Sequence, residues 1–299
     1  MRKLILLGFL GLVLLFSGCD NQTTNGCSDS GLKLVDYNVY PLEKIYQGDI
    51  VAFAFWLENK GSSTAGNVKV DFFDTPGFDV TRLECQENPS GGKECNLGEI
   101  LSEEGCLGEM RQVKTELRAR GSGDNTVSFA VIYNYHGNSL LSFGIWEKNS
   151  KNQYGNKRIG STYGPVKVEI NPGFLMSRIV DDRKQTTTEW VEEGQRFTVN
   201  INVRESGNFG QSSSKTSISN FKVKLNYLEP IADGKCDFIL SGEYLVPKES
   251  IEVPTKKPLK CDLKANDNIG QEWITGGIEV DYDYEYSFVK QQTFKINTE

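Results

Sequence analysis

The stretch that decides the fold is QGDIVAFAFWLENKG, Gln47 to Gly61, because a second version of it, EGQRFTVNINVRESG, runs from Glu193 to Gly207. Each copy has a glycine near its start, then alternating apolar residues, then a polar end with a second glycine. Period-2 alternation is typical of a β-strand with one face in a core. The corresponding apolar positions are Val51, Phe53, Phe55 and Leu57 in the first copy and Phe197, Val199, Ile201 and Val203 in the second. Two copies predict two domains.

Four more pairs of segments match in the same order, each pair about 150 residues apart, which indicates internal duplication. The pairs are 67–72 with 220–225, 98–101 with 242–245, 114–119 with 260–265, and 129–135 with 278–284. The alternative is that strands of this kind resemble each other anyway. Asn171-Pro172-Gly173 interrupts any strand, so we expect one domain over residues 32–172 and a second over 173–299.

The N-terminus has the pattern of a secretory signal over residues 1–18. Arg2 and Lys3 precede an apolar run from Leu4 to Phe16. As a helix this run is only about 20 Å long, against roughly 30 Å for the hydrocarbon core of a membrane. Residues 19–31 are mostly polar and predict a tether.

The signal ends in FSGC, Phe16 to Cys19, which resembles the lipobox of secreted lipoproteins. That resemblance implies that Cys19 takes a lipid and becomes the mature N-terminus. Ordinary cleavage or a retained anchor is the alternative. The expected partner is therefore the membrane, through an N-terminal lipid, and the expected location is the extracellular face of the cell membrane.

Seven cysteines in an exported chain predict disulfides, and setting Cys19 aside leaves an even number. The second half contains only Cys236 and Cys261, so these two should pair. The four cysteines of the first half allow three connectivities. We favour Cys85 with Cys95, which leaves Cys27 with Cys106.

The strand patterns resemble the CARDB family of cell-adhesion-related domains, which is common on archaeal and bacterial surfaces. The residues that carry the resemblance are Gly48 to Gly61 with Asn67 to Phe72, and in the second half Gly194, Phe197 to Val203, Gly207 and Asn220 to Leu225. It implies an all-β protein of two tandem, antiparallel, immunoglobulin-like β-sandwich domains after the lipoprotein signal. Cell adhesion is the function class that it implies.

Several function classes lack the residues that they need. The formal net charge is −7, and it becomes two units more negative when Arg2 and Lys3 leave with the signal. Nucleic acid is therefore not an expected partner. His136 is the one histidine, expected at an exposed strand end, and no nucleophile, zinc or phosphate-loop motif is present. We expect that the protein is not an enzyme and that it binds no cofactor and no metal.

A row of carboxylates, Glu279, Asp281, Asp283 and Glu285, alternates along one predicted strand. Our interpretation is a solvated outer face. Calcium binding with help from a loop is one alternative. A carbohydrate-active hydrolase that uses Asp281, Asp283 or Glu285 is the other, because such enzymes need only two carboxylates.

The outward positions of the organising strand differ between the copies. The first has Ile50, Ala52, Ala54 and Trp56 where the second has Arg196, Thr198, Asn200 and Asn202. Large exposed apolar patches are rare on monomers, so we expect either the insert from Trp146 to Gly164 or a partner protein to cover this face.

We predict a non-catalytic surface protein that binds protein or glycan or supports the envelope. The candidate contact residues are Trp56, Trp146, Tyr154, Lys157, Arg158 and Tyr163, and the sequence does not indicate an oligomeric state.

Overall fold

The structure is a computed structural model. It describes residues 27, 31–41, 44–85, 88–90, 92–103, 106, 108–150, 158–173, 176–181, 186–206 and 216–298. The side chains of 88–90, 176–181 and 186–189 are outside this description. The described residues form strands and contain no α-helix. Among them, no helix is long and apolar enough to cross a membrane.

The strands form three sheets. The first sheet has the order β1 (Leu32–Tyr40), β3 (Ile50–Asn59), β8 (Met110–Ala119), β5 (Phe78–Cys85) and β6 (Asn88–Ser90). The second sheet has the order β11 (Val166–Pro172), β14 (Arg196–Glu205), β19 (Leu259–Ala265) and β16 (Leu228–Pro230).

The third, which we call the shared sheet, contains eleven strands. Its main path is β12 (Met176–Asp181), β13 (Thr186–Glu192), β9 (Gly123–Trp146), β20 (Trp273–Asn297), β15 (Ser217–Asn226), β18 (Tyr244–Pro247) and β17 (Phe238–Ser241). Four strands lie off this path: β2 (Ile45–Tyr46), β4 (Ala65–Asp74), β7 (Glu94–Ile100) and β10 (Arg158–Ser161).

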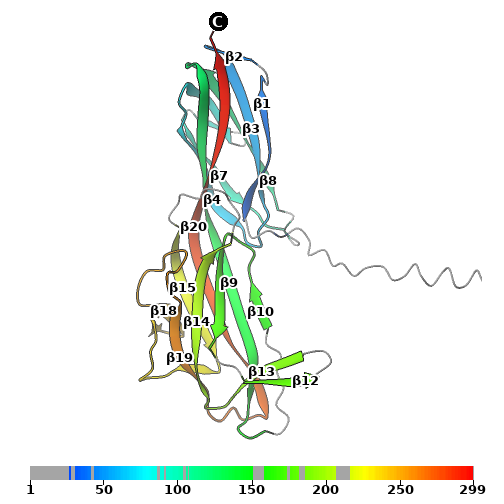
Figure 1. Cartoon of the computed structure of the whole chain (residues 1–299), viewed down its shortest axis with the longest axis vertical. Helices are drawn as coiled ribbons and strands as arrows, with labels where there is room; N and C mark the ends of the chain where they lie inside the picture. The colour runs from blue at the N-terminus through cyan, green and yellow to red at the C-terminus, as the bar shows by residue number, and fades with distance from the viewer. Residues whose placement is uncertain are drawn as a thin grey trace, which may run out of the picture.

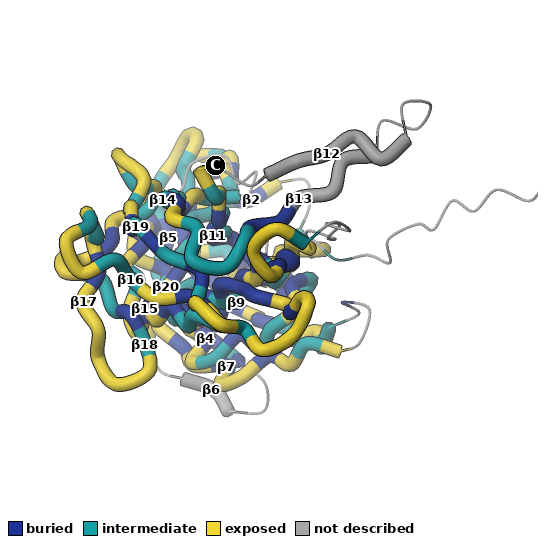
Figure 2. Tube along the Cα trace, turned by 90° about the horizontal axis from the view of Figure 1, so that it is seen from below, coloured by how far each residue is buried: buried dark blue, intermediate teal, exposed yellow. Residues whose placement is uncertain are grey.

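Two long strands, β9 with 24 residues and β20 with 25, run the length of the molecule. They pair antiparallel from Trp146 opposite Trp273 at one end to Gly123 opposite Ile296 at the other. Figure 1 shows the result, an elongated body in which the first sheet covers one end of this pair and the second sheet covers the other. We call these ends the upper stack and the lower stack, as they appear in that view. Seen along the axis, buried residues gather around β4, β9 and β20 and exposed ones at the periphery (Figure 2).

The core explains why these residues form strands in this order. In β3, Phe53 and Phe55 are 3 % and 0 % exposed, and Phe55 stacks on Phe129 of β9 with ring centroids 4.5 Å apart. Phe294, near the end of β20, packs against Phe53 in the same upper core. Burial of such side chains is the main favourable term in folding, so the last strand of the chain stabilises the first sheet.

The lower stack is built in the reciprocal way. Phe143, near the end of β9, packs against Phe197 of β14 in a T-shaped contact at 6.0 Å. Each long strand thus begins in the stack of its own half of the chain and ends in the other stack. The division into domains 32–172 and 173–299 does not follow the sheets, because residues 158–172 and half of β9 lie in the lower stack. That division stays a prediction.

The segments that match in sequence occupy matching places in the sheets. The order β1-β3-β8-β5 corresponds to β11-β14-β19-β16, and β4 with β7 corresponds to β15 with β18. Even the short parallel pairings correspond, β2 with β20 and β13 with β9. Tyr135 and Tyr284, which the sequence match makes equivalent, lie directly opposite each other in the ladder. The two halves are therefore related by an approximate two-fold axis between these tyrosines.

Buried tyrosines occupy the junction around this axis. The Tyr133 hydroxyl accepts a hydrogen bond from the backbone N–H of Leu32, at the start of β1. The Tyr282 hydroxyl donates to the carbonyl of Val166, at the start of β11. A phenol suits this place because its ring fills apolar space while its hydroxyl satisfies a backbone group. Burial is the main cause that raises the pKa of Tyr282 to about 12.

We predict that neither half of the chain folds alone. When the two fragments 27–172 and 173–298 are produced separately, each lacks one long strand of the pair that covers both cores. We expect no cooperative thermal transition by circular dichroism for either fragment, and a regained transition on mixing. Two fragments that each unfold cooperatively near the melting temperature of the whole chain would contradict the prediction.

Candidate binding face on the first sheet

The outer side of the first sheet carries an apolar surface that we call the β3 face, formed by Tyr40, Ile50, Ala52, Ala54 and Trp56. Tyr40 on β1 is 75 % exposed and lies opposite Ala52 in the ladder. Ile50 is 46 % exposed, and Ala54 and Trp56 are half-buried. These residues face outward because the alternate positions of β3 are buried in the upper core.

The β3 face is hollowed where its side chains are smallest. Ala52 and Ala54 form part of the floor of a cavity of about 230 Å³. Longer side chains of β1, β5 and β8 stand around it, including Tyr40, Arg82 and Lys114. Alanine is uncommon in strand interiors, and two of them at this place leave room for a group from outside.

Charged side chains of both signs form the rim of the hollow. Arg82 makes ion pairs with Glu84 and, at 3.7 Å, with Glu116. Lys114 is the cross-strand neighbour of both Ala54 and Glu84. Two cations and two anions give the rim no net charge. The hollow is therefore apolar in the centre and polar at the edge, without a preference for a charged ligand.

The equivalent face of the second sheet is polar. Thr198, which corresponds to Ala52, donates a hydrogen bond of 2.6 Å to the Asp262 carboxylate, and the backbone N–H of Lys235 donates a second. These bonds lower the pKa of Asp262, the one from Thr198 most. Asn200 takes the position of Ala54. The two halves thus share a backbone arrangement but differ in what they present to solvent.

The insert from Trp146 to Gly164 does not cover the β3 face in its described part, so that expectation is wrong there. Trp146 lies at the far end of the lower stack and stacks on Trp273 with ring centroids 5.9 Å apart. Residues 158–161 form β10, which pairs with residues 139–142 of β9. The physical reason is that the free edge of β9 offers unpaired backbone groups to the insert. Residues 151–157 lie outside the described residues.

The predicted contact residues do not form one surface. Trp56 lies on the β3 face, and Arg158 is exposed on β10. Trp146 is 1 % exposed, so almost none of its side chain is accessible to a partner. Tyr154 and Lys157, like the lipidation candidate Cys19, lie outside the described residues.

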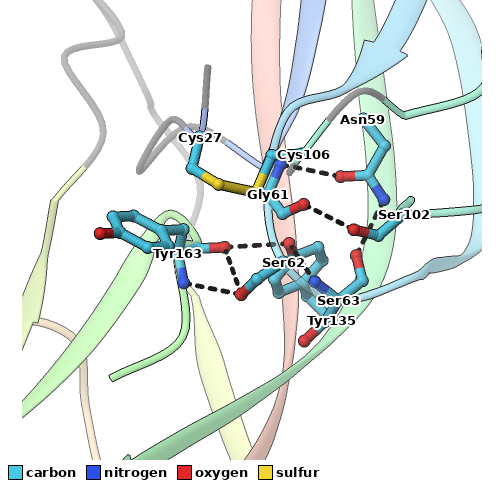
Figure 3. The surroundings of a disulfide bond; sticks show 9 residues. All are labelled: Cys27, Asn59, Gly61, Ser62, Ser63, Ser102, Cys106, Tyr135 and Tyr163. Atoms are coloured by element: carbon cyan, nitrogen blue, oxygen red, sulfur yellow. Dashed lines mark hydrogen bonds between the residues drawn. A yellow bond between two sulfur atoms is a disulfide. The ribbon is translucent and has the colours of Figure 1, made fainter. Parts of the chain in front are cut away.

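Tyr163 lies at the junction of the two stacks, close to a disulfide (Figure 3). Its carbonyl accepts hydrogen bonds from the Ser62 N–H at 2.9 Å and from the Tyr135 hydroxyl at 3.0 Å, and its own N–H donates to the Ser62 hydroxyl. The Tyr135 hydroxyl also accepts from the N–H of Ser63. These bonds connect the β3–β4 loop of the upper stack to the segment that leads into β11 of the lower stack.

The disulfides join the pairs that the sequence favours: Cys236 with Cys261, Cys85 with Cys95, and Cys27 with Cys106. The first lies in the lower stack and the second links β5 to β7 of the upper stack. Cys27 with Cys106 stands at the junction (Figure 3). Disulfides of this number are typical of proteins that fold outside the cytosol.

The carboxylate row lies on the outer side of β20, and three of its members, Glu279, Asp281 and Asp283, have hydrogen-bonding neighbours on β9 and β15. His136, which we expected at a strand end, lies in the middle of β9, and its Nδ1 is 2.8 Å from the Asp283 carboxylate. Asn138 donates to Glu279 and Asp281, and Asn220 donates to Asp283. Among the described residues, no group of three or more His, Cys, Asp or Glu side chains could hold a metal ion.

Asp283 does not suit the role of the protonated acid in a hydrolase. A glycosidase needs one carboxyl group whose raised pKa keeps it protonated. Partial burial raises the pKa of Asp283, but hydrogen bonds from Asn220 and His136, together with attraction to His136 and Lys222, outweigh that effect and leave the pKa below the ordinary value. The group is therefore a carboxylate at neutral pH.

No family model matches this chain, and no curated protein matches it. Among solved structures it is similar to the secreted serine protease VesC of Vibrio cholerae, at 11 % identity over 84 % of this chain and 50 % of that one, with a TM-score of 0.21. A Salmonella alpha-2-macroglobulin matches at 11 % identity with a TM-score of 0.19, and the chain spans 15 % of that protein. The C-terminal domain of the AgI/II polypeptide BspA of Streptococcus agalactiae matches at 9 % identity over 89 % of this chain and 98 % of the domain, with a TM-score of 0.17. Similarities at this level show neither a shared family nor a shared function.

We predict that Tyr135→Phe weakens the junction and changes its response to alkali. Loss of hydrogen bonds to a buried hydroxyl costs about 1 to 2 kcal/mol in the free energy of unfolding at neutral pH. Burial is the main cause that raises the pKa of Tyr135 from 10.0 to about 12. The unfolded state therefore loses its proton first, and the intact protein loses stability as the pH rises from about 10 to about 12.

Urea denaturation at a series of pH values measures this effect. The variant should show a shallower loss of stability above pH 10 than the parent. Tyr37→Phe is the matched control because Tyr37 is 54 % exposed, and it should leave both the neutral stability and the slope unchanged. An identical alkaline slope in parent and Tyr135→Phe would show that this hydroxyl does not titrate as described.

Proposed function

We propose that this chain is an exported surface protein, held to the membrane by a lipid on Cys19, that binds a partner protein through the β3 face. It acts without catalysis, in adhesion or as a binding element of the cell surface. Its two stacks are taken as immunoglobulin-like sandwiches. The FSGC sequence before the tether supports the anchor, and the three disulfides support an extracellular location.

The observation that carries the binding function is the hollow over Ala52 and Ala54, which stays open among the described residues. An apolar centre inside a polar rim is the usual anatomy of a protein interface. The floor takes an apolar or aromatic side chain, and Tyr40 supplies the exposed aromatic ring that such interfaces favour. A glycan would use the same ring for stacking, but the lining around the hollow offers it little besides the ion-paired rim.

The reciprocal face of the second sheet supports the assignment by contrast. Its equivalent positions are filled by side chains that satisfy one another, as Thr198 and Asp262 do. Had both copies kept apolar outer faces, the pattern would be a property of the fold. Only the first copy has an apolar outer face, so the fold alone does not account for the β3 face.

We predict that Ala54→Arg strongly weakens partner capture. The long side chain fills the hollow and adds an unpaired charge at the centre of the interface, which should weaken binding at least tenfold. The measurement is capture of surface proteins from the native cells by the full-length protein, quantified by mass spectrometry against beads without protein. The melting temperature should stay within a few degrees, because the substituted position is half-buried at the surface.

Asn200→Arg is the matched control, since residue 200 is the equivalent position on the second sheet. It introduces the same charge at the same place in the other copy and should leave capture unchanged. If Ala54→Arg and the parent capture the same proteins equally well, the β3 face is not the binding surface. If both arginine variants lose capture alike, the effect is one of charge alone and the assignment fails.

A further inference from the structure

The chain enters the folded body at the junction, not at either end. Cys27 is disulfide-bonded to Cys106, with their Cα atoms 4.8 Å apart. Figure 3 shows this bond beside Ser62 and Tyr163. Four residues further on, the carbonyl of Gly31 accepts a hydrogen bond of 2.8 Å from the N–H of Lys60. Two independent contacts therefore fix the entry point in the middle of the molecule.

The body extends far to both sides of this point. From the Tyr135–Tyr284 pair, β9 and β20 continue to the tip of the upper stack and to the tip of the lower stack. At about 3.3 Å per residue, each arm is about 35 to 40 Å long, and the whole body measures about 80 Å.

The link to the lipidation site is shorter than either arm. Cys19 precedes Cys27 by eight residues, which span at most about 29 Å when fully extended. A flexible polar chain of that length has an end-to-end distance of about 15 Å. The first of these distances is a limit of covalent geometry and holds for any conformation of the link.

We propose that the Cys27–Cys106 disulfide makes this protein lie along the membrane, with both stacks close to the lipid surface. The inference rests on the proposed lipid at Cys19. An upright body would put the junction about 35 to 40 Å from the membrane, beyond the reach of the link. A partner therefore approaches the long side of the body. The β3 face stays near the membrane.

The short link, and not attraction to lipid, holds the body in this orientation. The chain has a net negative charge, and the row from Glu279 to Glu285 adds local negative charge at the junction. Anionic head groups repel such a surface. An orientation set by chain length does not respond to salt, whereas one set by charge weakens as salt screens it. Ionic strength thus separates the two causes.

The disulfide matters because it shortens the free link. Without it, the first fixed residue is Gly31, and the twelve residues from Cys19 span at most about 43 Å. That is enough for an upright body. An inserted flexible segment has the same effect while it leaves the disulfide intact, so the two variants test length through different chemistry.

The experiment uses the full-length protein purified from its native membrane and placed in vesicles of neutral phosphatidylcholine. Mass spectrometry of the N-terminal peptide first establishes whether Cys19 carries the lipid. Energy transfer to an acceptor dye in the bilayer is then measured from a donor dye at position 295, near the upper tip, or at position 148, near the lower tip. Both positions are exposed. The second series uses a variant with twenty Gly and Ser residues inserted after Asp20, and the third uses the double variant C27S/C106S.

We expect strong transfer from both tips in the parent, at low and high salt alike. Transfer should fall by half or more for at least one tip in the insertion variant and in C27S/C106S. Strong transfer from only one tip of the lipidated parent would overturn the inference and leave the anchor intact, as would equal transfer in parent and insertion variant. An unmodified Cys19 would instead overturn the anchor itself, and the orientation with it.

Discussion

The antiparallel pairing of β9 with β20 is the constraint on which the rest of the structure depends. Each strand belongs to one half of the sequence, yet each buries one end in the core of the other half. The two hydrophobic cores therefore share their central strands. Because each core contains the long strand of the other half, we expect the two stacks to unfold as one cooperative body.

The junction follows from this pairing. Where the two cores meet, the long strands continue from one stack into the other, and the starts of β1 and β11 leave backbone groups to be satisfied. Tyr133 and Tyr282 do so in equivalent ways, one by accepting from Leu32 and the other by donating to Val166. The Tyr163 and Ser62 contacts close the same joint from outside. A joint through which both long strands run continuously fixes the β3 face relative to the point where the chain enters.

The proposed binding function rests on differences between two similar halves. The buried positions of β3 and β14 remain apolar in both, because a core tolerates little else. The outward positions differ. The first half has an apolar hollow over Ala52 and Ala54, and the second has a hydrogen-bonded polar surface around Thr198 and Asp262. In the proposed function, the first copy carries the binding surface while the second presents hydrogen-bonded polar groups to solvent.

The sequence by itself determined the local pattern of this protein. Alternation in β3 and β14 identified strands and their buried faces, and the collinear matches identified which strands of the two halves are equivalent. The cysteine count predicted the pair Cys236 with Cys261 but left three connectivities open in the first half. Periodicity reports only which side of a strand is buried, so it could not show which strands are neighbours. Tertiary structure alone decided that β9 and β20 cross between the halves, that Trp146 is buried against Trp273, and that the insert pairs with β9 instead of covering the β3 face. The physical reason is that hydrogen bonding between strands is made by backbone groups, which every residue except proline presents alike.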